Sequence, residues 1–186
     1  MLVHIKNNKI VDIVHSPVHL KTRMLPIDRY QEVQEPKTKP LAKDYETVVR
    51  RKPELVDGVP THTYVVIELS VAKYKLKVKD RVTEYRYKKE ISGTTLDDGT
   101  KVQTDRESRA AAVQLLNAFK DGSVTLSNWK VNGDFILVDQ DKMQEIVDAQ
   151  NIHVSNRFNA EAVSYEAIDA LETNEEIRTY DFRSNF

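Results

Sequence analysis

The chain has 186 residues, of which 40% are apolar and 31% are charged, a balance typical of folded domains. Five glycines and six prolines exclude collagen-like and low-complexity polymers, and no apolar run approaches the ~20 residues that span a bilayer. The absence of cysteine excludes disulfides, thiolate catalysis and cysteine-based zinc sites. We expect neither a membrane protein nor a signal peptide, because the first lysines follow the apolar residues instead of preceding them.

The formal net charge of −1 conceals an uneven distribution along the chain. Residues 61–91 carry 8 Lys or Arg against 4 Asp or Glu, whereas residues 92–186 carry 9 against 17. This asymmetry indicates head-to-tail attraction between copies or docking on a partner of opposite charge, and it also fits a set of solvated faces. Because the basic part is short and carries no motif that reads a nucleic-acid groove, we expect no nucleic-acid binding.

The N-terminal part of the chain is predicted to be rich in strands. Two apolar segments flank Asn7-Asn8 and predict a β-hairpin over residues 2–15, because asparagine tolerates the positive φ of a tight turn. Residues 16–41 contain four prolines and few closely spaced apolar residues, which predicts an extended, irregular arm. Further strands are expected within residues 44–51 and 61–69, with a turn at residues 56–60.

The segment SVAKYKLKVKDRVTEYRYKKE, residues 70–90, fits two structures. Tyr74, Leu76 and Val78 alternate with lysines, as in a half-buried strand, but several apolar residues also recur at helical spacing. About 20 residues without glycine or proline exceed a normal strand, so a helix is favoured. A long hairpin turning at Lys79-Asp80 remains the competing interpretation.

The stretch TTLDDGTKVQTDRES, residues 94–108, predicts two short strands around an Asp-Asp-Gly turn that lead into a helix. Thr104 and Glu107 have the spacing of a capping box, in which each side chain satisfies a backbone N–H at the start of a helix. The apolar stripe that follows ends at Gly122, a residue suited to the left-handed conformation after a helix.

A second hairpin and a long helix are predicted next. The pair Asn132-Gly133 marks the turn of a hairpin that carries Trp129, the only tryptophan. Asp139 is expected to cap a long helix that begins near Gln140. Thr173 and Glu176 repeat the capping-box spacing before a last short helical turn.

The core of this C-terminal part is predicted from apolar spacing. On the hairpin, Trp129, Val131, Phe135 and Leu137 are expected on the inward face, with Asn128, Lys130, Asp134 and Ile136 outward. The predicted core residues are Val113, Leu116, Trp129, Phe135, Val147, Val154 and Phe158. Trp129 is therefore interpreted as a core anchor, with an interface role as the alternative.

Residues 92–182 resemble an uncharacterised C-terminal domain of tailed-bacteriophage tail and tail-fibre proteins. The resemblance rests on TTLDDGTKVQTDRES as hairpin and cap, NWKVNGDFILVDQDKM as the tryptophan hairpin and second cap, and EAIDALETNEEI as the end. It implies a structural or assembly role in a virion, and it brings no catalytic residues.

Candidates for chemistry are few. His15 and His19 have the spacing of helical metal ligands, but Pro17 between them would break such a helix. Asp139 and Asp141 begin like a calcium loop without its central glycine and later ligands, so capping explains them better. No phosphate loop or hydrolase motif appears. We therefore expect no enzyme activity, no metal and no cofactor.

We expect an α+β protein with two parts. Residues 1–91 form a β-rich docking region that includes the extended arm at 16–41, and residues 92–186 form a helix, β-hairpin, helix domain that folds alone. Tyrosines and prolines concentrate in the first part, and tyrosine is enriched at interfaces. The predicted protein-binding residues are Pro17, Pro26, Tyr30, Pro36, Pro40, Tyr45 and Tyr64.

The expected function is that of a bacteriophage tail, baseplate or tail-fibre attachment component that binds neighbouring tail proteins as a homo-oligomer. Such a protein would be assembled in the host cytoplasm and would reside in the tail of the virion. The alternative is a tail-fibre assembly chaperone absent from the mature virion. A small phage regulator of host proteins is a third and weaker hypothesis.

Overall fold

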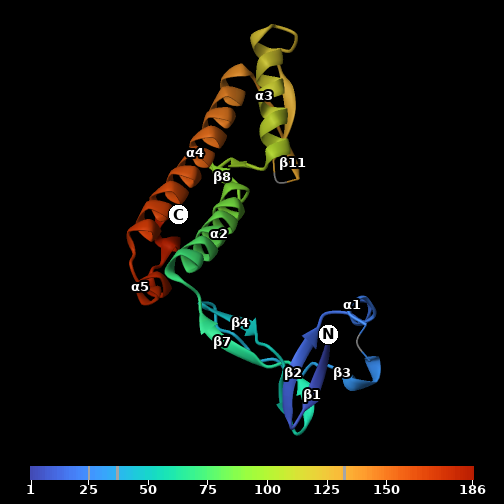
Figure 1. The fold of residues 1–186 in the computed structure, drawn as a ribbon. Helices are drawn as coiled ribbons and strands as arrows, with labels where there is room; N and C mark the ends of the chain where they lie inside the picture. The colour runs from blue at the N-terminus through green and yellow to red at the C-terminus, as the bar shows by residue number, and fades with distance from the viewer. Residues whose placement is uncertain (25, 37, 132) are drawn as a thin grey trace. The chain divides into compact units, whose positions relative to one another are not determined.

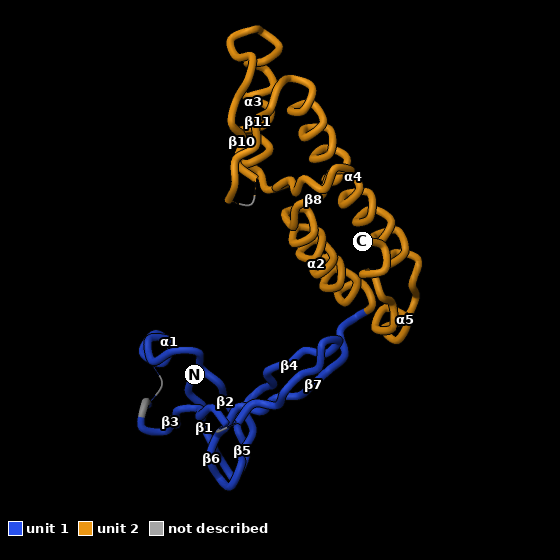
Figure 2. The backbone as a smooth tube through the Cα atoms, turned by 180° about the vertical axis from the view of Figure 1, so that it is seen from behind, with its two compact units in different colours: residues 1–70 blue, residues 71–186 orange. Residues whose placement is uncertain are grey.

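The computed structural model describes residues 1–24, 26–36, 38–131 and 133–186 and divides the chain into two compact units, residues 1–70 and 71–186 (Figure 2). Strands dominate the first unit and helices the second (Figure 1). The predicted α+β class is confirmed. No helix in the described part of the chain is long and apolar enough to cross a membrane.

Unit 1 consists of small antiparallel sheets. The predicted N-terminal hairpin is present, and Asn7 and Asn8 have φ of 52° and 56° at its turn. Asp57 and Gly58, also at positive φ, form the turn that was expected at residues 56–60. The strands are β1 (Leu2–Lys6), β2 (Lys9–Val14), β3 (Tyr30–Glu32), β4 (Glu46–Arg50), β5 (Glu54–Val56), β6 (Val59–Thr61) and β7 (Tyr64–Glu68), paired in the orders β2-β1-β3, β4-β7 and β5-β6.

The segment predicted as an extended arm folds back on unit 1 over much of its length. It contains the helix α1 (Pro17–Thr22), the 3-10 turn η1 (Ile27–Arg29) and the strand β3, which pairs with β1. Pro17 occupies the first helical position, where the missing N–H costs nothing, and Leu20 is buried. The arm prediction is therefore wrong for these residues, because proline there starts a helix. Residues 38–41 remain exposed and irregular.

Unit 2 is arranged along its longest helix, α4 (Gln140–Ala170) (Figure 1). Helix α2 (Val71–Glu90) packs against the C-terminal half of α4, and α3 (Arg106–Lys120) packs against the N-terminal half. The remaining elements are β8 (Thr94–Thr95), β9 (Lys101–Val102), β10 (Ser127–Val131), β11 (Asp134–Val138), α5 (Asn174–Thr179) and η2 (Phe182–Asn185).

Residues 71–90 form a helix, as favoured from the sequence. Tyr74, Val78 and Val82 recur every four residues, and all three are buried. This stripe makes α2 part of unit 2, so the structure divides the chain after Ser70 and not after residue 91. The boundary expected after residue 91 follows the start of the resembling region at residue 92, which leaves α2 out.

The predicted core is correct in part. Leu116 and Val147 are buried, and Trp129 packs half-buried against the same cluster. Val113, Phe135 and Phe158 are exposed, and Val154 is only half-buried, so their assignment to the core is wrong. The observed cluster consists of Leu96, Val102, Ala112, Leu116, Phe119, Val138, Met143, Ile146 and Val147.

The error at Phe135 comes from the register of the hairpin. Val131 pairs with Asp134 and Trp129 pairs with Ile136, so two residues lie in the loop. The odd-numbered residues of β10 therefore share a face with the even-numbered residues of β11. Phe135 and Leu137 consequently point to the face opposite Trp129. Of the predicted turn pair, Asn132 lies outside the described residues, and Gly133 has a φ of 96°.

The helix caps lie where the sequence predicts them, except that the cap of α3 is one residue later. Asp105, and not Thr104, caps α3 by accepting from the backbone N of Ser108 at 3.0 Å. Asp139 caps α4 as predicted, accepting from the backbone N of Lys142 at 2.9 Å. The capping box of Thr173 and Glu176 at α5 and the positive φ of Gly122 after α3 are also confirmed.

Candidate functional site

Four buried polar side chains lie together where α2 ends and α3 begins, against the middle of α4. They are Glu90, Thr104, Gln150 and His153, and we call them the polar junction. Buried apolar side chains fill unit 2 on both sides of the polar junction. One group lies between α3 and α4, and the other lies between α2 and α4. Buried polar groups are costly unless they are hydrogen-bonded, so their partners decide what the junction can do.

Thr104 fixes the chain immediately after α2. Its hydroxyl donates to the backbone carbonyl of Glu90 and accepts from the backbone N of Gly93 at 3.0 Å. The side chain is therefore occupied by the preceding helix, which explains why Asp105 takes over the cap of α3.

Helix α4 holds the two chain segments that cross it. Gln150 donates through Nε2 to the carbonyl of Gln103 at 2.8 Å. The Nε2 atom of His153 lies 2.9 Å from the carbonyl of Lys89. Both side chains thus tie α4 to the backbone of these segments, and the carbonyl of Lys89 also accepts from the hydroxyl of Ser92 at 2.8 Å.

The carboxylate of Glu90 is the centre of an ionic cluster. Its Oε1 atom accepts from Nη2 of Arg109 at 3.0 Å, and its Oε2 atom pairs with Arg86. Arg86 also donates through Nε to Glu161 at 3.0 Å. Two guanidinium groups thus balance two carboxylates and connect α2, α3 and α4. Because each group already has charged partners, the cluster acts as a clamp and offers no free acid or base.

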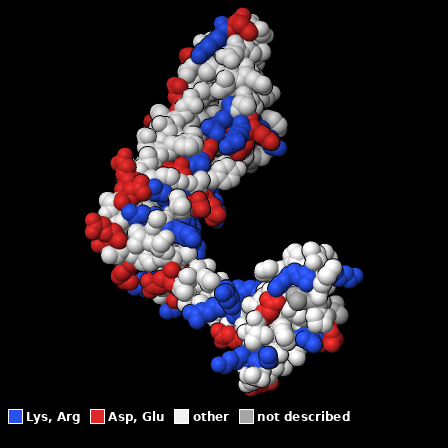
Figure 3. Space-filling model, in the orientation of Figure 1, with Lys and Arg blue, Asp and Glu red and all other residues white. Residues whose placement is uncertain are grey.

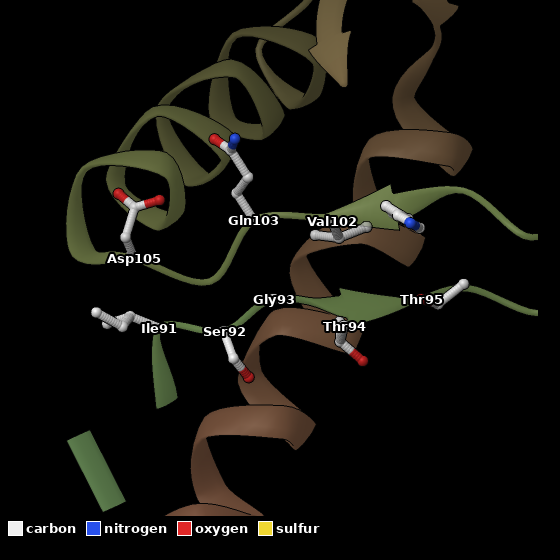
Figure 4. Close-up of a pocket in the computed structure, with 9 residues that line it drawn as sticks. Ile91, Ser92, Gly93, Thr94, Thr95, Val102, Gln103 and Asp105 are labelled. Atoms are coloured by element: carbon white, nitrogen blue, oxygen red, sulfur yellow. The ribbon is translucent and has the colours of Figure 1, made fainter. Parts of the chain in front are cut away.

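A recess of about 500 Å³ lies beside the polar junction (Figure 4). Figure 4 shows its two walls, residues 91–95 and residues 101–105, with the start of α3 at one end. The Asp105 carboxylate in this recess accepts from the hydroxyl of Ser108 at 2.6 Å, and this bond holds the pKa of Asp105 below its usual value. The Asp105 carboxylate is therefore engaged at the start of α3.

A second concavity, of about 450 Å³, shares Thr94 and Thr95 with that recess. Its apolar lining consists of Leu96 and, on α4, Ala149 and Ile152, of which Ile152 is 61% exposed. Its charged residues are Asp97, Glu145, Asp148 and Arg157, so acidic groups predominate. We call it the acidic groove.

Lys142, close to this groove, forms ion pairs with two acidic side chains. Lys142 contacts Asp98 at 2.6 Å and Glu145 at 2.8 Å. The hydrogen bond from Lys142 is the main cause of a strongly lowered pKa of Asp98, and the same bond raises the pKa of Lys142. Acidic and basic side chains are interspersed over the face of unit 2 drawn in Figure 3.

The β10–β11 hairpin has an exposed apolar face. Phe135 is 67% exposed and Leu137 is 64% exposed, and both lie on the side opposite Trp129. Lys130 pairs with Phe135 across the strands, and Asn128 pairs with Leu137. These four residues are the outer hairpin face. Sequence reasoning placed Phe135 and Leu137 in the core, so it missed this surface.

The protein-binding residues predicted in unit 1 are distributed between exposed and half-buried positions. Tyr30 donates to Asp12 at 2.6 Å, and Tyr64 donates to Glu35 at 2.6 Å. These bonds lower the pKa of each carboxyl group. Both phenol groups therefore have partners within unit 1. Pro17, Pro26 and Pro40 are exposed, whereas Tyr30, Pro36, Tyr45 and Tyr64 are half-buried.

The histidine pair that was considered as a metal site is divided by the start of a helix. Helix α1 begins at Pro17, so His15 lies outside the helix that carries His19. Among the described residues, no group of three or more His, Asp or Glu side chains is placed to hold a metal ion.

A family comparison covers most of unit 2. The sequence profile described as a domain of unknown function, DUF4376, matches residues 73–184, more than half of the chain. The chain belongs to this family. The DUF4376 match begins within α2 and ends within η2, so it supports the division of the chain after Ser70. No curated protein and no solved structure matches the chain.

The residues of the DUF4376 polar junction carried a weak sequence signal. Met143, Ile146, Gln150 and His153 are spaced three and four residues apart, as on the buried stripe of a packed helix. Gln150 and His153 are polar, so a prediction of the buried face of α4 from apolar residues alone selects Val154 and Phe158 instead. A buried polar position in a helix is recognisable only when its partner is known.

Proposed function

We propose that this DUF4376 protein is a non-enzymatic assembly protein that binds other proteins through unit 2. The observation that carries this proposal is the outer hairpin face, where Phe135 and Leu137 lie side by side and exposed. Adjacent large apolar side chains in water mark binding surfaces, and aromatic residues are frequent anchors there. The polar rim of Lys130 and Asn128 suits a contact that forms in water.

The polar junction supports binding over catalysis. Glu90, Thr104, Gln150 and His153 each contact a backbone carbonyl or a charged partner inside unit 2. A catalytic group must be free to contact a substrate, and these side chains are occupied. Their contacts make unit 2 a rigid support for its surfaces.

The biological setting follows from the resemblance of residues 94–108, 128–143 and 166–177 to the domain of phage tail and tail-fibre proteins. We infer a bacteriophage tail, baseplate or fibre-attachment component, present in the virion tail and assembled in the host cytoplasm. Its partners are neighbouring tail or fibre proteins. A tail-fibre assembly chaperone, absent from the finished particle, is the alternative.

Mass spectrometry of purified virions tests this function. Wild-type particles should contain the chain at a fixed copy number, and particles made with Phe135→Ser and Leu137→Ser together should lack it. Val163→Ser is the matched control, because Val163 is also an exposed apolar residue but lies on α4. A chain that is required for fibre formation yet absent from wild-type particles would establish the chaperone instead. Equal incorporation of the hairpin variant would contradict binding through the outer hairpin face.

A further inference from the structure

Strands β4 and β7 lie side by side as a two-stranded ribbon of unit 1 (Figure 1). Each strand has five residues, and together they contain four valines and one isoleucine. None of the side chains in either strand is buried, and Val49, Val66 and Ile67 are 38%, 37% and 46% exposed. In the part of the chain that the structure describes, the two strands pair only with each other. Because a two-stranded ribbon is only marginally stable in water, it is suited to accept a further strand.

The register of the ribbon fixes which backbone groups face outward. The ladder continues beyond both ends through two bonds of 2.8 Å, from the N–H of Arg51 to the carbonyl of Thr63 and from that of Leu69 to Tyr45. Bonded and non-bonded pairs alternate in an antiparallel ladder, so the odd-numbered residues bond across the ribbon. The even-numbered residues of β7, which are Tyr64, Val66 and Glu68, therefore point their backbone N–H and C=O groups away from β4.

The two outer edges of the ribbon differ. On β4, the backbone N of Glu46 donates to the carbonyl of Lys43 at 3.1 Å, so a local turn occupies part of that edge. Just before β7, Gln34 bonds to the backbone of Pro60 and His62 at 2.9 Å each. Along β7 itself, the described residues place no third strand. An open edge of this kind pairs with a strand of another chain.

We propose that two copies of this chain pair edge to edge through β7, antiparallel and centred on Val66, and so form a four-stranded sheet. This register aligns the whole strand and sets Val66 opposite Val66 of the second copy. Tyr64 then faces Glu68, and Val65 faces Ile67, so apolar residues meet and no like charges lie directly opposite each other. The contact is isologous, because both copies use the same edge.

The charges at the ends of the ribbon favour a second copy as the occupant. Glu68 is exposed at one end, and Arg51 and Lys52 are exposed just beyond the other end. A two-fold axis reverses the second ribbon, so the acidic end of each copy lies toward the basic end of the other. A parallel arrangement would instead bring like ends together. Exposed charges contribute little affinity, so they set the direction while backbone bonds and apolar contact hold the sheet.

A single introduced cysteine tests the register, since the sequence has no cysteine of its own. Opposite residues of a bonded antiparallel pair have Cα atoms about 5.5 Å apart, which is within the range of a disulfide. Val66→Cys in the full chain should therefore give a disulfide-linked dimer under mild oxidation, seen by non-reducing electrophoresis. Val49→Cys is the matched control, because Val49 is 38% exposed against 37% for Val66 but lies on β4. It should stay monomeric.

Association without a covalent link provides a second measurement. Sedimentation should show a concentration-dependent dimer of the wild type. Val66→Lys puts like charges opposite each other on the axis and should weaken the dimer about tenfold or more, whereas Val49→Lys should dimerise like the wild type. Val66→Pro should also weaken it, because proline removes an outward N–H that the ribbon itself does not use.

The proposed contact is independent of the outer hairpin face. Phe135→Ser with Leu137→Ser should leave the dimer intact, so failure of either proposal is distinguishable from failure of the other. A monomeric wild type or an undiminished Val66→Lys dimer would overturn pairing through β7. So would a disulfide that forms through Val48→Cys and not through Val66→Cys, because it would place the contact on the edge of β4.

Discussion

Glu90, the last residue of α2, forms a partly buried ion pair with Arg109 near the start of α3, with 3.0 Å between Oε1 and Nη2. Only 2% of Glu90 is exposed, and its second oxygen pairs with Arg86. A carboxylate at this depth is retained only when cationic groups surround it. The pair therefore fixes the angle at which the chain passes from α2 toward α3.

Replacing Glu90 by Ala should destabilise unit 2 strongly. The change leaves Arg86 and Arg109 without their shared partner, and breaking a buried pair costs about 3 to 5 kcal/mol. Trp129 is the only tryptophan and lies in unit 2, so its fluorescence during urea unfolding reports this unit within the full chain. Glu175→Ala, which removes an exposed pair with Arg178, should leave the midpoint unchanged. Equal midpoints for both variants would show that the cluster does not clamp the helices.

The hydrogen bond between Asp98 and Lys142 should make stability depend on pH in the acid range. The pKa of Asp98 is lowered from its usual 3.8, mainly by Lys142, so the folded state binds the proton less tightly than the unfolded state. The contribution is thus complete above about pH 5 and is lost as pH falls through the lower folded pKa. In a double-mutant cycle of Asp98→Asn and Lys142→Ala, the coupling should shrink steadily below about pH 4. A coupling that stays constant down to pH 2 would exclude this pair as the source.

The sequence predicted most elements of unit 2 because their signals are local. A turn pair or a helix cap involves backbone groups only a few residues away, so it is visible in a single sequence. Examples are the predicted turn Asn132-Gly133, the cap Asp139, and the capping box of Thr173 and Glu176. Burial was harder to predict, since it depends on distant partners. Gln150 occupies a core position only because the carbonyl of Gln103 meets it there.

Two details show why the remaining features escaped prediction. The predicted Asn132-Gly133 turn pairs Trp129 with Ile136, whereas the face assignment set Phe135 beside Trp129, and a shift of one residue inverts a whole strand. Pro17 was interpreted as a breaker of structure, although proline at the first position of a helix is favourable. The same two errors affect the predicted binding surfaces, because a residue wrongly assigned to the core is not considered as part of a surface.

Gly93 and Gly122 allow a comparison of backbone strain with close packing. Both have positive φ, near 80°, which costs a residue with a Cβ atom about 1 to 2 kcal/mol. A Cβ atom on Gly93 would lie 3.0 Å from the carbonyl oxygen of Val102, whereas one on Gly122 would have open space. Gly122→Ala should therefore cost only the strain, and Gly93→Ala about 2 to 4 kcal/mol, as measured by Trp129 fluorescence in urea. Equal losses would mean that the β8–β9 turn moves aside without cost.

The fold of unit 2 should require α2, so a fragment of residues 71–186 should fold and a fragment of residues 92–186 should not. This corrects the boundary expected from the sequence. Tyr74, Val78 and Val82 are buried, and removing α2 would leave Ile168 and other apolar residues of α4 in water.

The loss of α2 would also remove the partners of two further groups. Arg109 would lose Glu90, and Phe182 would lose the ring of Tyr85, 5.8 Å away. Far-ultraviolet circular dichroism and thermal melting of the two fragments provide the measurement. Residues 71–186 should melt cooperatively, whereas residues 92–186 should show reduced helicity and a broad transition. A sharp transition of the shorter fragment at the same temperature would mean that α2 is an appendage, and the clamp around Glu90 would then contribute nothing to the fold.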